Sequence, residues 1–363
     1  MDKCIDTQRL IPKHCSFSKN RVLYLAVVMV LVGAGCTGKV AGHSQTLADS
    51  TSTSSKYRLS TLKIGVLPTQ TLTEQEQMIK PLKEYLERSF GQRIDNESPP
   101  NILGGQGRQE RQGGFPSGRT LGTQRVQSMS VTSFDFQIAK DYKEIIDWLV
   151  QGKLDMAYLS PLAYLEAVDR GAKVEPLVAA IDIDTRQPWY RACIIVKQDS
   201  PIKTLKDLKG RRIAFVDKSS TSGYLMPVAT FNQIGIDSQR DFAQVLYAGS
   251  HSKSLAALED GSVDAAATNV SSYLKRQKSG KLTPENSRVL WESAPIPNSP
   301  IVVSQKLPPE VILELKQAFI SSPDGIEDIM GIESTGYTLV IPSDYAPIQR
   351  LRKNIKLSSI TAQ

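Results

Sequence analysis

The chain has 363 residues, a formal net charge of +7 and 40% hydrophobic residues, enough for two lobes with separate cores. The modest positive charge suits an anionic ligand or an anionic membrane surface and does not choose between them. With only three histidines and four cysteines, a His/Cys metal site is not expected, and we expect no other cofactor.

Residues 1–35 are typical of a bacterial export signal. Basic residues precede an apolar run over 22–32, which is shorter than the ~20 residues of a membrane-spanning helix. Cys36 follows three small residues, which resembles a lipobox, in which the signal is cleaved before a cysteine that is then acylated; Gly33 stands where Leu is usual. We therefore expect an exported protein that is lipid-anchored through Cys36 on the periplasmic side of the cell membrane. An ordinary secretory signal with an incidental cysteine is the alternative.

Residues 36–60 are rich in Ser, Thr, Gly and Ala and show no apolar periodicity, so we expect a flexible tether after the acylated cysteine. Cys193 is then the single cysteine of the folded part, which excludes an intramolecular disulfide there. Its apolar neighbours indicate a small core residue. His251 is the single histidine of the folded part.

From about residue 61, strand-like and helix-like segments alternate, which predicts an α/β architecture. The expected elements, in chain order, are a strand over 63–68, a helix after a Thr73/Glu76 capping box, a helix from Asp141 to Gly152, a strand over 154–159 and a helix from Ser160, followed by strand–helix units over 212–234, 244–258 and 265–279.

One stretch, residues 92–130, breaks this alternation. It is rich in Gly, Arg and Gln and almost free of apolar residues, so it cannot bury enough surface to offset its ordering entropy. We expect a disordered surface insertion. Arg/Gly-rich segments also occur in RNA-binding proteins, but the interleaved aromatics of a stacking platform are missing, and we expect no nucleic-acid partner.

Hydroxyl residues gather where an expected strand meets an expected helix, at residues 219–222. Free backbone N–H groups and the helix dipole make such a helix start a ready anion site. A run of N-cap residues without a ligand is the alternative. The arrangement recurs at Ser160 and around His251, which is expected just before a helix. Helix starts converging from two lobes bind a dianion without burying Lys or Arg.

The segment 220–227, preceded by 207–215, carries the most specific resemblance of the chain; shorter matching pieces lie at 64–68, 155–158, 248–251, 263–266, 296–301 and 344–348. Together they resemble the phosphate/phosphite/phosphonate substrate-binding components of ABC transporters, a branch of the type II periplasmic binding proteins. The resemblance implies two lobes, residues 61–187 plus 301–363 and residues 188–300. Each lobe would be a mixed, mainly parallel sheet flanked by helices, with the ligand cleft between the lobes and connecting strands near 188–191 and 298–301.

The same resemblance implies the ligand contacts and the partners. Oxyanion contacts fall on Ser220, Thr221, Ser222 and His251, and the opposite wall falls on Tyr158 and Ser160. The implied partners are a small phosphorus oxyanion, an ABC permease with its ATPase, and the membrane through the lipid anchor.

Two departures from the family narrow the expected ligand. Members that take aminoalkylphosphonates have carboxylates where this chain has Ser272 and Ser299, and a pocket tyrosine where it has Leu159. An ammonium group buried without a carboxylate is strongly penalised. We therefore expect phosphite, phosphate or a short alkylphosphonate.

Two other functions compete with transport. A ligand sensor for a signalling partner would use the same closed form. A serine hydrolase would use Ser220 or Ser222 with His251, but the chain has no Gly-x-Ser-x-Gly motif and Ser220 stands in a run of equivalent hydroxyls. We expect a binding protein and not an enzyme.

Overall fold

The computed structural model describes residues 61–96, 131–183, 185–322 and 334–361. These residues belong to one compact unit, residues 55–363. The export signal, Cys36, the tether and most of the expected insertion lie outside the described residues. The expected insertion began too early, however, because the first helix continues through Asn96 and so takes in residues 92–96. None of the helices within the described ranges combines the length and the apolar character needed to cross a membrane.

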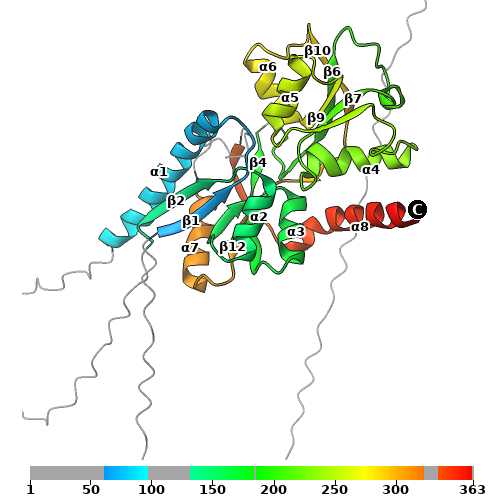
Figure 1. Cartoon of the computed structure of the whole chain (residues 1–363). Coiled ribbons are helices and arrows are strands. Elements are labelled where there is room, and N and C mark those ends of the chain that lie inside the picture. The colour runs from blue at the N-terminus through cyan, green and yellow to red at the C-terminus, as the bar shows by residue number, and fades with distance from the viewer. Residues whose placement is uncertain (1–60, 97–130, 184, 323–333, 362–363) are drawn as a thin grey trace, which may run out of the picture. The chain divides into compact units, whose positions relative to one another are not determined.

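The described residues form three sheets, and the first has six strands in the order β13-β4-β12-β3-β1-β2 (Figure 1). The strand β1 pairs in parallel with β2 and β3, whereas β12 and β13 pair antiparallel with their neighbours. The bounds are β1 Thr61–Val66, β2 Ser133–Ile138, β3 Met156–Tyr158, β4 Val174–Asp182, β12 Pro300–Ser304 and β13 Ser334–Leu339.

The second sheet has five strands in the order β10-β6-β9-β7-β8. Again three neighbouring strands, β8, β7 and β9, run parallel, while β6 and β10 are antiparallel to their neighbours. The bounds are β6 Ala192–Lys197, β7 Arg212–Phe215, β8 Gln244–Tyr247, β9 Ala265–Asn269 and β10 Ser287–Glu292. The α/β class with mixed sheets is therefore as expected, although the parallel pairings are confined to one half of each large sheet.

A two-stranded ribbon lies where the chain passes between the two large sheets. Strand β5 (Trp189–Tyr190) leads from β4 to β6, and β11 (Ile296–Pro297) leads back from β10 to β12. The two pair antiparallel, with Tyr190 opposite Ile296. Of the two crossing segments expected near 188–191 and 298–301, the first contains β5, whereas the second begins just after β11 and runs into β12. The two segments are in contact, since the Asn298 N–H donates to the Pro188 carbonyl at 2.9 Å.

Eight helices accompany the sheets of the described part; their bounds are α1 Leu72–Asn96, α2 Tyr142–Val150, α3 Pro161–Asp169, α4 Met226–Gln233, α5 His251–Glu259, α6 Val270–Lys278, α7 Pro309–Ile320 and α8 Ala346–Thr361. The expected caps of α2 and α3 are confirmed: Asp141 accepts from the Glu144 N–H and Ser160 from the Ala163 N–H.

The cap expected for α1 was displaced by two residues. The reciprocal pair is Thr71 with Glu74, because the Glu74 carboxylate accepts from both the N–H and the hydroxyl of Thr71. Thr73 and Glu76 have the same spacing and lie within the helix.

Two main cores follow the two large sheets. Apolar residues of β1, β3, β12 and the helices α1, α2, α3 and α7 form one, and residues of β6, β7 and α4 form the other. Helix α8 contributes to both regions, because Ile348 packs in a cluster with Leu162 and Tyr190 while Ile355 also packs against the core of the five-stranded sheet. Cys193 is fully buried in the five-stranded sheet, as its apolar neighbours predicted.

Candidate functional site

The four hydroxyl residues 219–222, called the hydroxyl run below, follow β7 at the point where the chain turns into a helix. Ser220 caps this helix by accepting from the Gly223 N–H at 3.0 Å. The first turn, Thr221–Leu225, is π-helical and continues directly into α4. Sequence patterning placed the start of this helix at Gly223. The helix begins two residues earlier, so Thr221 and Ser222 are part of its first turn.

A second helix start, that of α3, meets this turn from the six-stranded sheet. The Ser160 hydroxyl donates to the Ser219 carbonyl at 2.9 Å, and the Leu162 N–H donates to Thr221 Oγ1 at 2.8 Å. Two of the helix starts that were expected to converge are thus joined directly. All three hydroxyl residues 220–222 are buried.

Ser219 is held differently from its neighbours. Its hydroxyl donates to Glu166 Oε2 at 2.6 Å and its N–H to Asp217 Oδ1 at 2.8 Å. Burial raises the pKa of Asp217, and the nearby charges of Glu166 and Asp141 raise it further. Because these carboxylates repel an anion, the surroundings of Ser219 do not suit an oxyanion. Residues 220–222 remain as the candidate oxyanion contacts of the turn.

Two buried phenols face this turn, and sequence reasoning missed both. Burial raises the pKa of Tyr190 to about 12, against the opposing effect of nearby hydroxyls of Ser222, Thr221 and Ser299. Burial likewise raises the pKa of Tyr142, and Ser220 lies near enough to oppose that rise. The Tyr142 hydroxyl nevertheless makes no regular hydrogen bond within the described residues. Such an orphaned buried donor needs an explanation, and a ligand oxygen would supply one.

His251 is the first residue of α5 and was expected just before it, so this helix begins earlier than expected, and Ser250 caps it. Its Nδ1 lies 3.0 Å from Thr268 Oγ1 and its Nε2 lies 3.4 Å from Asn269 Nδ2. The Asn269 amide donates, so Nε2 accepts and Nδ1–H donates to Thr268. Burial lowers the pKa of His251 to about 4, so the ring is neutral at neutral pH. Its hydrogen bonds are made to residues of β9 and not to the hydroxyl run.

Tyr158, which was expected at the opposite wall of the site, is a core residue. It is buried in the core of the six-stranded sheet, and its hydroxyl lies 3.5 Å from that of Tyr337. This contact assigns the side chain to the core, although the strand that carries it ends at the Ser160 junction.

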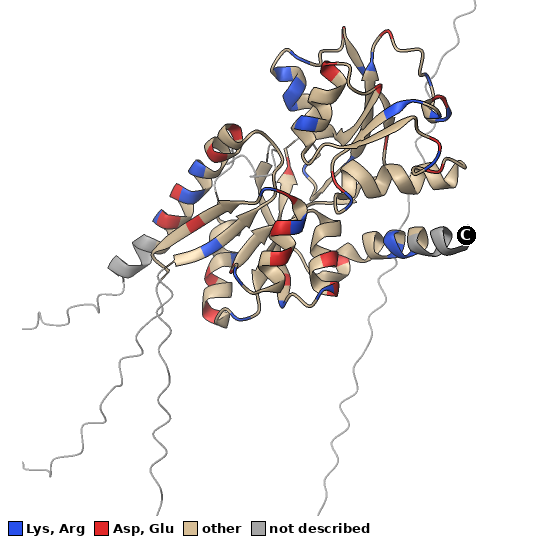
Figure 2. Cartoon of the chain, in the orientation of Figure 1, with Lys and Arg blue, Asp and Glu red and all other residues tan. Residues whose placement is uncertain are grey.

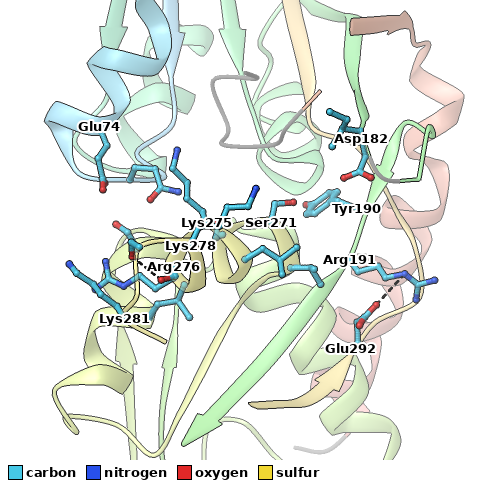
Figure 3. A pocket seen from close by; sticks show the side chains of 18 of the residues that line it. Glu74, Asp182, Tyr190, Arg191, Ser271, Lys275, Arg276, Lys278, Lys281 and Glu292 are labelled. Carbon is cyan, nitrogen blue, oxygen red and sulfur yellow. Dashed lines mark hydrogen bonds and ion pairs between the residues drawn. The ribbon is translucent and has the colours of Figure 1, made fainter. Parts of the chain in front are cut away.

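A cavity of about 660 Å³ (Figure 3) shares one residue, Tyr190, with the surroundings of the hydroxyl run. Tyr190 belongs to both, since it lines the cavity and faces Thr221 and Ser222. The cavity is also lined by Gln70 from the six-stranded side and by Ser252 and Ser272 from α5 and α6. The N–H of Ser252 donates to the carbonyl of Thr69, on the six-stranded side, at 3.2 Å. Among the described residues no group of three His, Cys, Asp or Glu side chains is placed to hold a metal ion.

Comparison with known proteins gives a consistent result. Residues 125–345 match the family model described as ABC transporter, phosphonate, periplasmic substrate-binding protein, which covers more than half of the chain. The chain is 31% identical over 202 residues to the phosphate-import protein PhnD of Mycolicibacterium smegmatis, covering 53% of this chain and 63% of that protein. It is 34% identical over 176 residues to the phosphonates-binding periplasmic protein of Escherichia coli, covering 47% and 50%.

The matched region thus spans less than two thirds of the length of either relative. Among solved structures, PhnD1 from Prochlorococcus marinus in complex with methylphosphonate has a TM-score of 0.64 and 17% identity, covering 82% of this chain and 98% of that one. This likeness establishes the fold, which is that of the type II periplasmic binding proteins.

Proposed function

The chain belongs to the family of periplasmic substrate-binding proteins of phosphonate ABC transporters, and on this premise we propose that it captures a small phosphorus oxyanion for an ABC permease and its ATPase. The observation that carries the proposal is the direct meeting of two helix starts at Thr221, which brings the buried hydroxyls of one helix and the positive dipole ends of both to the same place. Such a site holds a dianion with neutral donors and avoids the cost of burying Lys or Arg.

We assign the donors as follows. Ser220, Thr221 and Ser222 would offer their hydroxyls and the N–H groups of the first turn, and Tyr142 and Tyr190 would offer two phenols. Ser160 already donates to Ser219 and accepts from Ala163, so its role would be to hold the two helix starts together. His251 would act as a neutral ring that positions β9 beside the site, and Tyr158 would support the junction from the core.

The ligand is proposed to be phosphite, phosphate or a short alkylphosphonate. Ser272 and Ser299 stand where aminoalkylphosphonate binders carry carboxylates, and both are buried. An ammonium group placed there would lack a counter-charge. A relative named for phosphate import and a fold neighbour holding methylphosphonate fit the same ligand class.

Capture would involve closure of two lobes. We propose that residues 61–187 with 301–363 form one lobe and residues 188–300 the other, because these ranges follow the membership of the two large sheets. The ribbon of β5 and β11 would act as the hinge. Helix α8 would have to slide during the motion, since Ile355 packs against the core of the second lobe.

The hydroxyl of Thr221 gives the first test. Replacing it in Thr221→Val keeps the shape of the side chain but removes the donor to the ligand and the acceptor for the Leu162 N–H. We expect calorimetric titration with phosphite or methylphosphonate to show affinity weaker by ~1–3 kcal/mol. Thr230→Val, on α4 with its hydroxyl bonded to the Met226 carbonyl, is the matched control and should bind as the parent does. An unchanged affinity in Thr221→Val would remove this residue from the site.

We further propose that the protein is exported and anchored through a lipid on Cys36, on the lipobox-like pattern that ends there. In Cys36→Ser the acylated thiol is lost, and the protein should move from the membrane fraction to the soluble fraction of the cells. A variant that still fractionates with membranes would refute the lipid anchor and leave the binding site untouched.

The hydrolase alternative gains no support from the site. His251 pairs with Thr268 and Asn269, and neither supplies the carboxylate that would orient a general base. A sensor for a signalling partner would use the same closed form; transport is proposed because the family model describes a transporter component.

A further inference from the structure

The cavity lined by Tyr190 is larger than a simple oxyanion requires. Its volume of about 660 Å³ lies within the ~300–1,000 Å³ range of sites that hold whole small molecules. Tyr190 lines this cavity and also lies near the hydroxyls of Thr221 and Ser222. A substituent on a phosphorus held at residues 220–222 would therefore enter the cavity past the Tyr190 ring.

The Ser272 hydroxyl is a buried polar group of the cavity wall that lacks a partner. Ser272 lies in the first turn of α6, and its side chain is only 4% exposed. Its N–H donates to Asn269 Oδ1 at 2.7 Å, but its hydroxyl has no hydrogen-bond partner within the described residues. In Figure 3 the adjacent Ser271 points toward Tyr190, so the start of α6 faces the side of the cavity where the substituent would enter.

A second group of this kind is the Gln70 amide, which lines the cavity from the loop between β1 and α1. Its Nε2 is buried and has no acceptor among the residues that the structure describes. The loop itself is fixed, because the Thr69 N–H donates to Gln75 Oε1 at 3.3 Å and Gln75 Nε2 donates to the Leu67 carbonyl. The amide is therefore held in place without a partner of its own.

The two unpartnered groups lie at the same end of the cavity. The carbonyl of Thr69, the residue before Gln70, accepts from the Ser252 N–H at 3.2 Å. His251, the residue before Ser252, has its Nε2 3.4 Å from the amide of Asn269, which caps the turn that carries the unpartnered hydroxyl. Buried polar groups are rarely left without partners, and a polar group on the ligand substituent would satisfy both.

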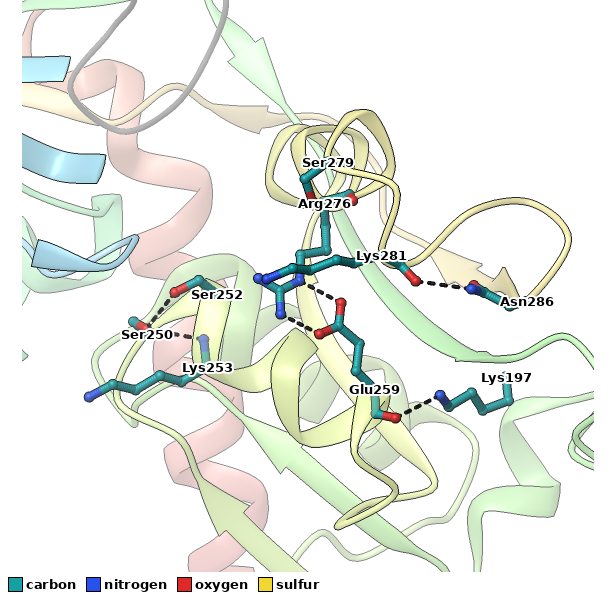
Figure 4. Close-up of polar contacts among 9 residues, drawn as sticks. All are labelled: Lys197, Ser250, Ser252, Lys253, Glu259, Arg276, Ser279, Lys281 and Asn286. Carbon is teal, nitrogen blue, oxygen red and sulfur yellow. Dashed lines mark hydrogen bonds and ion pairs between the residues drawn. The ribbon is translucent and has the colours of Figure 1, made fainter. Parts of the chain in front are cut away.

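Charged side chains around the cavity are paired with one another. Figure 2 shows basic residues grouped on α6. One of them, Arg276, forms a two-pronged pair with Glu259 on α5 (Figure 4). On the opposite wall, Arg191 Nε lies 3.3 Å from Glu292 Oε1. These pairs leave little attraction for a charge on the substituent.

Lys275 and Glu74 are balanced in the same way. Burial raises the pKa of the Glu74 carboxyl, but hydrogen bonds from Thr71 and the charges of Lys275 and Arg276 outweigh this effect and lower the pKa. The other basic residues of the lining are exposed to solvent, which screens their charge: Lys278 and Lys281. The buried, unpartnered groups of the cavity are a hydroxyl and an amide, so the substituent that fits them is polar and uncharged.

We propose that the cavity takes an uncharged substituent that carries a hydroxyl group, so that the preferred ligand is a hydroxyalkylphosphonate or a phosphate monoester with a further hydroxyl. The inference rests on the proposed oxyanion site, which would hold the phosphorus. The ligand hydroxyl would accept from Gln70 Nε2 and donate to Ser272 Oγ, because a hydroxyl can do both. Its alkyl stem would pack against Leu255 and Val270, which line the same cavity.

Four ligands of similar length test this by calorimetric titration of the purified protein. The terminal group is a hydroxyl in 2-hydroxyethylphosphonate, a methyl in propylphosphonate, a carboxylate in phosphonoacetate and an ammonium in 2-aminoethylphosphonate. We expect 2-hydroxyethylphosphonate to bind about 5- to 10-fold more tightly than propylphosphonate, because it gains hydrogen bonds to two groups that otherwise have none. The two charged ligands should bind more weakly than 2-hydroxyethylphosphonate, because each would bury a charge without a counter-charge.

Two variants and a control assign this preference to the unpartnered groups. In Ser272→Ala the ratio of the hydroxyethyl and propyl affinities should fall to within about twofold, with the propylphosphonate affinity unchanged. Urea unfolding should show no loss of stability, since this hydroxyl has no partner to lose. Gln70→Leu should lower the same ratio from the other wall. Ser279→Ala is the matched control: it lines the cavity after the last turn of α6, and its hydroxyl already donates to the Arg276 carbonyl at 2.7 Å.

Ser279→Ala should keep the full ratio. Equal binding of 2-hydroxyethylphosphonate and propylphosphonate, tighter binding of phosphonoacetate than of 2-hydroxyethylphosphonate, or a ratio that survives both Ser272→Ala and Gln70→Leu would each overturn the inference while leaving the oxyanion site standing. A ratio lost equally in Ser279→Ala would overturn it as well. If methylphosphonate and propylphosphonate also fail to bind, the proposed function falls together with it.

Discussion

Gly223→Ala is expected to disrupt both the stability of the protein and its ligand binding. A Cβ at this position would lie 2.3 Å from Val216 Cγ2, 2.5 Å from Val216 Cβ and 3.0 Å from Ser220 Oγ. Val216 is fully buried and branched at Cβ, so it has little freedom to turn away. The turn that carries residues 220–222 must move instead. We expect a loss of ~1–3 kcal/mol in the free energy of unfolding and a fall in oxyanion affinity of roughly 100-fold.

Gly65→Ala separates the two effects. In β1, a Cβ at Gly65 would lie 2.5 Å from Leu154 Cδ1 and 3.1 Å from Ile145 Cδ1, which are the flexible ends of two side chains away from the hydroxyl run. Urea unfolding should show destabilisation in both variants, whereas calorimetry should show lost affinity in Gly223→Ala alone. Parental affinity in a folded Gly223→Ala protein would mean that the first turn of this helix does not hold the ligand.

His251 is expected to make stability fall as the pH is lowered. Its pKa in the folded protein is about 4, below the ordinary value of 6.5, because the ring is buried. Between pH 4 and pH 6.5 the unfolded chain binds a proton on this ring that the folded protein does not bind. The contribution of the neutral ring to the free energy of unfolding is therefore fully present above pH 6.5 and is lost towards pH 4. The total loss is ~3 kcal/mol.

The measurement compares urea unfolding of the parent and of His251→Gln from pH 4.5 to 7.5, so that the titrations of the carboxylates cancel in the difference. The variant lacks the titrating ring and should lose less stability on acidification. In NMR spectra the ring signals of His251 should show no titration near pH 6.5. Equal pH slopes in the two proteins, or a ring that titrates near pH 6.5, would contradict the burial of a neutral histidine.

Sequence patterning predicted the elements that local chemistry determines. The caps Asp141 and Ser160 were found because a capping side chain bonds a backbone N–H only three residues away. The cap of α1 was displaced because Thr71/Glu74 and Thr73/Glu76 satisfy the same spacing, and the approach of the chain from β1 decides between them. The helix at 221 began early because a π-helical turn has no recognisable sequence signature.

The residues of the site were predicted unevenly, because some of them depend on contacts between distant segments. The run 220–222 and Ser160 follow from the anion-binding chemistry of helix starts and from family resemblance. Tyr142 and Tyr190 could not be found from local pattern, since nothing beside them in the chain indicates that their hydroxyls would reach the same turn. The contact of Tyr158 with Tyr337, 179 positions away, likewise appears only once the six-stranded sheet has formed.

The most direct test of the central proposal is a binding panel on the protein after partial unfolding and dialysis, which remove any ligand retained during purification. The panel holds phosphate, phosphite, methylphosphonate, 2-aminoethylphosphonate and sulfate, and the readout is the thermal unfolding midpoint. A ligand at 100 times its Kd adds ~2.7 kcal/mol, a readily measured shift. We expect a rise with phosphite, phosphate or methylphosphonate and none with 2-aminoethylphosphonate. No rise with any phosphorus compound, or a rise with sulfate alone, would contradict capture of a phosphorus oxyanion.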